Sequence, residues 1–96
     1  MFQIIPSNRF KSIYKKLIKN NKILEKQIDL VLMLIEINPK DQRLKTHKVN
    51  TNDGIMSWSS RVNGNIRIIW NYGKDNHNEI RLLKIGGHSG KDKVYN

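Results

Sequence analysis

The sequence predicts an α+β fold, in which a short N-terminal strand and a helical hairpin pack on one face of a mostly antiparallel sheet of four to five strands. The chain has 96 residues, enough for one compact domain, taken as residues 1–96. Apolar residues recur with helical spacing up to Pro39 and alternate with a period of two after it. Asn-Gly and other polar turn sequences separate the later segments, which is typical of hairpins.

The segment before Pro39 predicts one strand and two helices. Residues 2–5 (FQII) form a strand candidate, and Ser7 is suited to cap a helix that continues to Ile18. The sequence KNNK at 19–22 favours a tight connection between helices. A second, antiparallel helix is expected over 22–37, because the residue before a proline disfavours helical backbone.

The segment after Pro39 predicts the rest of the sheet. Residues 86–96 form a glycine-rich, basic tail that is too polar to be core. One layer of helices covers only one face of a sheet, so the other face is expected to be open to a ligand. The four strands are predicted at 44–49, 56–62, 65–72 and 79–85.

The hairpin that contains Arg67 determines which face carries charge. A two-residue turn would place Arg61 on the apolar face with Ile66, which is costly for a guanidinium. A three-residue loop over 62–64 instead aligns Arg61 with Asn65 and places both arginines on one face. We therefore predict the second register. The open face then carries Ser57, Ser59, Arg61 and Arg67, and the helix side carries Met56, Trp58, Ile66, Ile68, Trp70 and Tyr72.

Composition narrows the class of partner. The net charge is +10 and the sequence pI is about 10.1, which predicts RNA or DNA as partner, with an acidic protein partner or plain solubility as the alternatives. The chain has no cysteine, and its three histidines lack ligand-like spacing, so neither a disulfide nor a metal cofactor is expected. No signal-peptide pattern or membrane-length apolar run is present, which predicts a soluble, cytoplasmic protein without membrane association.

Four segments, RLKTHKV, SWSSRV, NIRIIWNY and IGGHSGKDKVY, resemble in order and spacing the RelE/ParE toxin superfamily, and within it the messenger-RNA interferases of the YoeB and YafQ type. The resemblance implies a RelE-like fold and the toxin of a type II toxin–antitoxin pair. It implies a metal-independent endoribonuclease that cleaves messenger RNA in the ribosomal decoding site and is bound by an acidic antitoxin. The alternatives are a non-enzymatic, ParE-like gyrase inhibitor and an inactive basic module that binds nucleic acid or antitoxin.

The implied reaction is attack of a ribose 2′-hydroxyl on the adjacent phosphorus, which needs a base, a fixed positive charge and an acid. The resemblance implies Arg67 as the charge, His88 as the acid, and Tyr95 as an aromatic residue that closes the site or stacks on a base. The base is either His47 or Asp41. His77 is interpreted as a surface loop residue. The expected phosphate contacts are Lys40, Arg43, Lys45, Lys48, Arg61, Lys84, Lys91 and Lys93.

Overall fold

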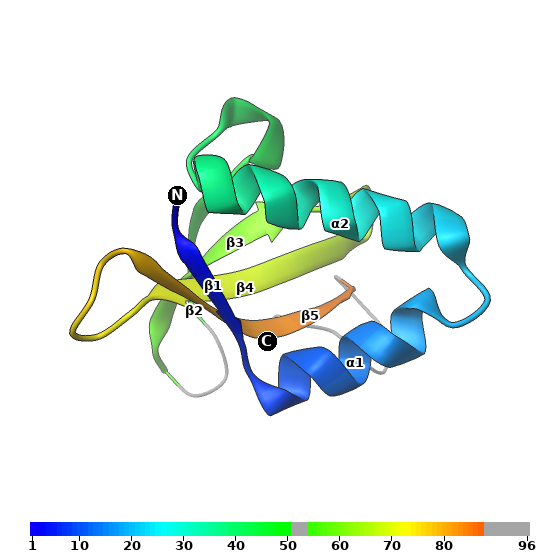
Figure 1. Cartoon of the computed structure of the whole chain (residues 1–96), viewed down its shortest axis with the longest axis horizontal. Helices are drawn as coiled ribbons and strands as arrows, with labels where there is room; N and C mark the ends of the chain where they lie inside the picture. The colour runs from blue at the N-terminus through cyan, green and yellow to red at the C-terminus, as the bar shows by residue number, and fades with distance from the viewer. Residues whose placement is uncertain (51–53, 88–96) are drawn as a thin grey trace.

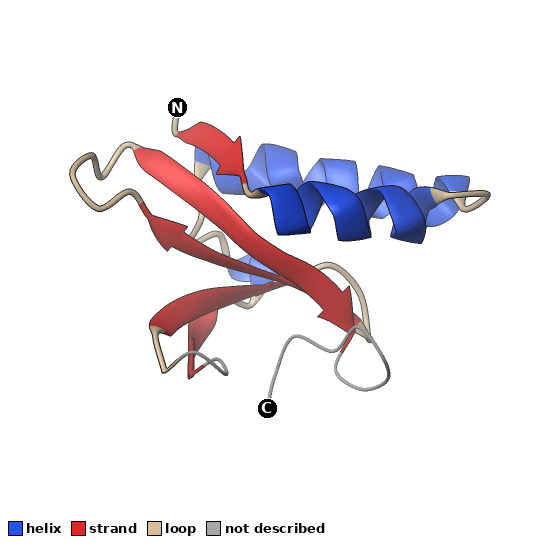
Figure 2. Ribbon diagram, turned by 90° about the horizontal axis from the view of Figure 1, so that it is seen from below, coloured by secondary structure: helices blue, strands red, loops and turns tan. Residues whose placement is uncertain are grey.

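The computed structural model describes residues 1–50 and 54–87 and has the predicted α+β fold (Figure 1). The five strands form one sheet in the order β1-β5-β4-β3-β2, with β1 parallel to β5 and the other pairs antiparallel. Both helices lie on the same side of the sheet (Figure 2). The elements are β1 (Gln3–Pro6), α1 (Asn8–Ile18), α2 (Lys22–Ile37), the 3₁₀ turn η1 (Gln42–Leu44), β2 (His47–Asn50), β3 (Met56–Arg61), β4 (Ile66–Tyr72) and β5 (Glu79–Gly87).

The two helices begin where their capping residues predict. The Ser7 side chain accepts a hydrogen bond from the Phe10 backbone N–H at 3.0 Å and donates one to the Leu83 carbonyl, so it also ties α1 to β5. In the connection, Asn20 adopts a left-handed conformation with φ of 57°, and Asn21 caps α2. Within the described ranges, neither helix is long and apolar enough to cross a membrane.

The core lies between the helices and the sheet. Burying each large aliphatic side chain there contributes about 1.5–3 kcal/mol. Trp58 is half-buried at the edge of this core and stacks on Trp70 with 6.0 Å between ring centroids, in line with its predicted place on the core side. The buried core residues are Phe10, Ile28, Val31, Leu34, Ile35, Leu44, Ile66, Ile68, Trp70, Ile80, Leu82 and Ile85.

The strand predicted over 44–49 is wrong at its beginning. Leu44 belongs to the turn η1 and is fully buried, and β2 starts only at His47. The reason is Asp41, whose side chain accepts a hydrogen bond from the Arg43 backbone N–H and caps the turn. Lys45 then ends the turn in a left-handed conformation with φ of 51°, which places its carbonyl close to His47.

The hairpin between β3 and β4 is wider than predicted. Arg61 pairs with Arg67 rather than with Asn65. The Asn63 side-chain oxygen explains the difference, since it accepts from the backbone N–H groups of both Asn65 and Ile66 and stabilises the longer loop. The shift is two residues, so both arginines still lie on the predicted face, because side chains alternate with a period of two.

Two further expectations about the sheet need correction. β5 continues past residue 85, and Gly86 and Gly87 are buried and pair with Arg67 and Ile66, so they are part of the sheet rather than of a tail. The remainder of the predicted tail, 88–96, lies outside the described residues. Ser57 and Ser59 lie on the predicted face but are only 1% and 0% exposed, so that part of the face is not open.

Candidate active site

The sheet face opposite the helices, here called the distal face, gathers four of the predicted site residues. His47, Ser59, Ile69 and Lys84 form one row across β2, β3, β4 and β5, and Arg61, Arg67 and Gly86 form the next row. Adjacent strands lie about 4.8 Å apart, so each row places its members side by side. These two rows of the distal face therefore combine an imidazole, two guanidiniums and an ammonium group.

Two of these charges are direct cross-strand neighbours. Arg61 on β3 pairs with Arg67 on β4, and like charges in that position destabilise a sheet. Neither arginine forms an ion pair with a carboxylate among residues 1–50 and 54–87. Gly86 of β5, on the other side of Arg67, adds no side chain to the face. The arrangement is suited to an anion, because a phosphate would neutralise both guanidiniums.

The Arg67 guanidinium is held in place by the loop of its own hairpin. Its Nη1 donates to the carbonyls of Asn63 and Ile66, and its side chain is half-buried. Asn63 is itself fixed, because its side-chain nitrogen donates to Gln27 of α2 at 3.0 Å. The guanidinium is therefore oriented before any ligand binds, a condition for electrostatic catalysis.

His47 is exposed, and one of its ring nitrogens contacts a backbone carbonyl. Nδ1 lies 3.0 Å from the Lys45 carbonyl oxygen. A carbonyl can only accept, so in this contact Nδ1 carries the proton, and in the neutral ring Nε2 carries the lone pair. His47 is thus set up to accept a proton through Nε2.

Asp41, the other candidate base, is occupied by a different interaction. Its carboxylate forms an ion pair with Arg43 at 2.8 Å and also accepts from the Arg43 side-chain Nε. These hydrogen bonds to Arg43 lower the pKa of Asp41 to about 2, which makes it a weak base. Arg43, predicted as a phosphate contact, has its guanidinium bound to this carboxylate.

Two lysines predicted to contact phosphate lie elsewhere. Lys48 pairs with Trp58 and is on the helix side of the sheet rather than the distal face. Its ammonium lies 5.5 Å from the Trp58 ring centroid, and that of Lys40 lies 3.4 Å from it, which are cation–π distances. Both therefore cover the edge of the core.

Lys45, also predicted to contact phosphate, is exposed. His77 is exposed as well, as expected for a loop residue.

Four predicted site residues, His88, Lys91, Lys93 and Tyr95, lie outside the described residues. Within the described part, no three His, Asp or Glu side chains come together to hold a metal ion.

The structure adds residues that sequence reasoning missed: Thr46, Ser60 and Asn63 support the site through hydrogen bonds. Only Asn63 had a sequence signal, since asparagine before glycine commonly caps a turn.

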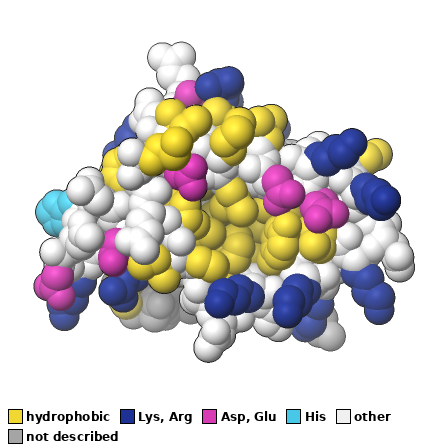
Figure 3. Space-filling view, in the orientation of Figure 1, with side chains coloured by type: hydrophobic (Ala, Val, Ile, Leu, Met, Phe, Trp, Pro, Cys, Tyr) yellow, Lys and Arg dark blue, Asp and Glu magenta, His cyan; other side chains and the backbone are white. Residues whose placement is uncertain are grey.

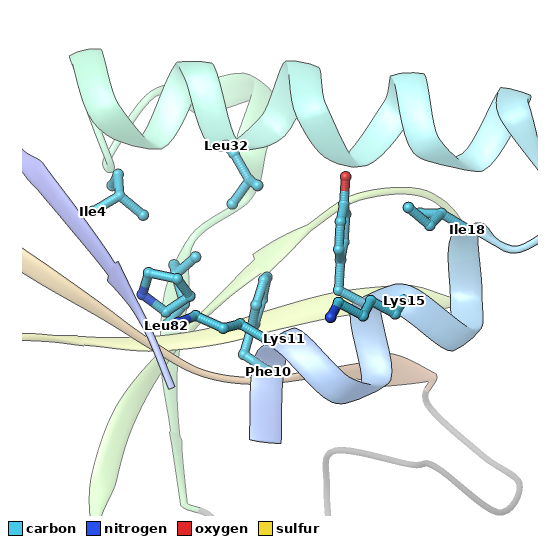
Figure 4. Close-up of a pocket in the computed structure, with 9 residues that line it drawn as sticks. Ile4, Phe10, Lys11, Lys15, Ile18, Leu32 and Leu82 are labelled. Carbon is cyan, nitrogen blue, oxygen red and sulfur yellow. The ribbon is translucent and has the colours of Figure 1, made fainter. Parts of the chain in front are cut away.

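The helix side carries a different feature, an apolar groove between α1 and α2 with a volume of about 510 Å³. Figure 3 shows it as an apolar hollow bordered by basic side chains on its α1 side. Lys11 and Lys15 stand at its rim, and Phe10 and Leu32 reach into it (Figure 4). The full lining is Ile4, Pro6, Phe10, Lys11, Tyr14, Lys15, Ile18, Leu32 and Leu82.

This fold is shared with toxins of known structure, although no family model and no curated protein matches the sequence. A YoeB–YefM complex from Staphylococcus aureus is 24% identical with a TM-score of 0.70, over 93% of this chain and 99% of that chain. YafQ from E. coli is 18% identical with a TM-score of 0.68, over 91% and 93%. A YoeB/ParE toxin from Agrobacterium tumefaciens is 10% identical with a TM-score of 0.73, over 92% and 100%.

The chain therefore has the fold of the RelE/ParE toxin superfamily. Toxins named YoeB and YafQ are among its structural neighbours, in agreement with the resemblance of the sequence motifs. One neighbour is a heterotetrameric complex of a toxin with its antitoxin.

Proposed function

We propose that the chain is the toxin of a type II toxin–antitoxin pair and acts in the cytoplasm as a ribosome-dependent, metal-independent messenger-RNA endoribonuclease. The observation that carries the proposal is the Arg61–Arg67 pair on the distal face, with His47 on the same face. Two guanidiniums side by side, neither of them paired with a carboxylate of residues 1–50 and 54–87, are unfavourable in the free protein, and a phosphodiester offsets that cost.

The reaction assigns one task to each group. His47 accepts the 2′-hydroxyl proton at Nε2, and the 2′-oxygen then bonds to the adjacent phosphorus. Arg67, oriented by the carbonyls of Asn63 and Ile66, stabilises the negative charge that builds on the phosphoryl oxygens, and Arg61 binds a second oxygen.

Attack by the 2′-oxygen gives a pentacoordinate phosphorane, and its collapse breaks the bond from phosphorus to the 5′-oxygen. That oxygen takes a proton from the acid, and the products are a 2′,3′-cyclic phosphate and a 5′-hydroxyl. The family resemblance assigns the acid to His88 and a closing or stacking role to Tyr95. Lys84 adds a phosphate contact next to Ile69 in the same sheet row.

An acidic antitoxin is the proposed partner of the groove between the helices. α1 contains basic residues and no acidic residue, and the groove lining is almost entirely apolar. An amphipathic segment with carboxylates beside its apolar face would fill the hollow and pair with Lys11 and Lys15. The YoeB–YefM complex among the neighbours supports an antitoxin partner.

Cleavage mapping in cells tests the enzyme. Induced expression of the chain should produce new 5′ ends within translated messages, detected by primer extension. We expect Arg67→Ala to reduce cleavage at least about 100-fold, and His47→Ala to reduce it at least about 100-fold. The matched control is Arg9→Ala, because Arg9 is an exposed arginine of α1 on the other side of the sheet.

Two outcomes would contradict the nuclease proposal. Folded Arg67→Ala protein that cleaves as well as the unmodified chain would remove the assigned role of the guanidinium. Growth arrest with intact messages and inhibited gyrase would instead support the ParE-like alternative.

A further inference from the structure

A chain of side-chain hydrogen bonds runs from the core to the residue before His47. The Trp70 indole N–H donates to the Ser60 hydroxyl at 2.8 Å, and Ser60 lies 2.8 Å from the Thr46 hydroxyl. Thr46 in turn donates to the Pro39 carbonyl at 2.8 Å. The indole can only donate and the carbonyl can only accept, so Ser60 must donate to Thr46.

This hydrogen-bond chain fixes the backbone that precedes β2. It joins β4, β3, Thr46 and the segment after α2, and every member uses its proton for the next one. Thr46 lies between Lys45, which has a left-handed backbone with φ of 51°, and His47. A left-handed conformation is unfavourable for lysine and persists only where neighbouring contacts hold it.

The Lys45 carbonyl determines the protonation pattern of His47. Free neutral histidine in water prefers the proton on Nε2, which would leave no lone pair there. The contact between Nδ1 and the Lys45 carbonyl, at 3.0 Å, favours the opposite tautomer. His47 is exposed, so water competes for Nδ1 unless the carbonyl is held in place.

We propose that Thr46 and Ser60 are positioning residues that hold the Lys45 carbonyl against His47 and so keep the Nε2 lone pair available as the base. The inference rests on the proposed function for its catalytic meaning. Among residues 1–50 and 54–87, the charged groups that share the distal face with His47 are Arg61, Arg67, Glu79, Arg81 and Lys84, and its strand neighbour Lys48 lies on the other face.

The tautomer is measured directly by long-range ¹H–¹⁵N correlation spectra of the histidine rings, recorded at pH 8. We expect the proton on Nδ1 in the unmodified chain. Thr46→Val keeps the shape and removes both hydroxyl hydrogen bonds, so the proton should move to Nε2. Thr46→Ser keeps the hydroxyl and should retain the Nδ1 proton, as should the surface control Ser12→Ala.

Cleavage on programmed ribosomes gives the functional readout. Thr46→Val should lower the single-turnover rate constant more than tenfold and change the half-saturating ribosome concentration less than twofold, with Thr46→Ser close to the unmodified chain. A proton on Nε2 of His47 in the unmodified chain would overturn the proposal. This result needs no variant, so it stands even if Thr46→Val does not fold. Folded Thr46→Val protein with an unchanged tautomer would overturn it as well.

The ring spectra could show the expected tautomers while the cleavage assay detects no cut message. That combination would support the positioning role of Thr46 and Ser60 and count against the proposed nuclease. The two failures are therefore distinguishable, because the ring spectra need no substrate.

Discussion

The two faces of the sheet differ in what holds their side chains. On the helix side, apolar residues such as Ile35 and Ile68 are fully buried and fixed by packing. On the distal face, Arg67 and His47 are fixed by hydrogen bonds to backbone carbonyls of nearby loops. Stability comes from one face and the proposed chemistry from the other, so substitutions should separate the two.

The largest expected effect is on the helix side. Ile35→Ala removes a fully buried side chain and should lower the free energy of unfolding by about 2–5 kcal/mol. Ile37→Ala, two residues along the same helix, alters a side chain that is 57% exposed and should change it by less than about 0.5 kcal/mol. Urea titrations followed by circular dichroism measure the free energy of unfolding of both variants. Equal losses in the two variants would contradict the assignment of stability to the buried side chains.

On the distal side, Asn63→Ala tests whether loop hydrogen bonds orient Arg67. It removes the side-chain bonds to Asn65, Ile66 and Gln27 but leaves the carbonyl that accepts from Arg67. We expect cleavage to fall about tenfold, which corresponds to about 1.4 kcal/mol of transition-state stabilisation. Cleavage rates on ribosomes measure the effect. Asn8→Ala, at the exposed start of α1, is the control, and equal rates in both variants would contradict the orientation of Arg67 by its loop.

The groove allows a sharper test of the helix side. The charge reversals Lys11→Glu and Lys15→Glu should together weaken antitoxin binding about tenfold at low salt and less at high salt, because exposed charges are screened. Calorimetric titration with the antitoxin measures the affinity. Lys74→Glu changes an exposed lysine in the turn between β4 and β5, and an equal loss in that variant would show a general effect of net charge instead of a groove.

The smallest effect concerns alkaline pH. Burial and the hydrogen bond that Tyr14 donates to Asp29 at 2.9 Å raise the pKa of Tyr14 to about 12. The folded state thus favours the protonated phenol, so this contribution to stability is complete below pH 10 and is lost as the pH rises from about 10 to about 12. Between pH 9 and 11, the free energy of unfolding of Tyr14→Phe, measured by urea titration, should fall less than that of the unmodified chain. An equal fall in both chains would contradict the link between Tyr14 ionisation and stability.

Local patterns predicted the elements well and the loops poorly. The caps at Ser7 and Asn21 and the change of period after Pro39 are local signals, and the helices follow them. The hairpin face was predictable because burying Arg61 is costly, whereas its loop length depended on the hydrogen bonds of the Asn63 side chain. The turn before β2 depends on the capping carboxylate of Asp41, and alternation alone did not reveal it.

The candidate site was predictable only in part, for a physical reason. Residue type and motif order proposed Arg67 and His47 as candidates, since a reaction at phosphorus needs a lasting charge and a proton acceptor, and the structure places both on the distal face. The side of the sheet on which Lys48 lies depends on the register of β2 against β3, and the ion pair that occupies the Asp41 carboxylate depends on a contact with Arg43. The support from Thr46 and Ser60 arises from residues 14 positions apart, which no local pattern records.

The place of β5 in the sheet has a consequence for synthesis of the protein. Among the described strands, β1 pairs with β5 alone, and the Ser7 cap of α1 donates to the Leu83 carbonyl. During translation, the N-terminal segment emerges long before residues 79–87 exist, so α1 has no β5 to pack on until those residues have been synthesised. A nascent chain that has not yet reached residue 87 thus lacks the complete sheet on which α1 packs.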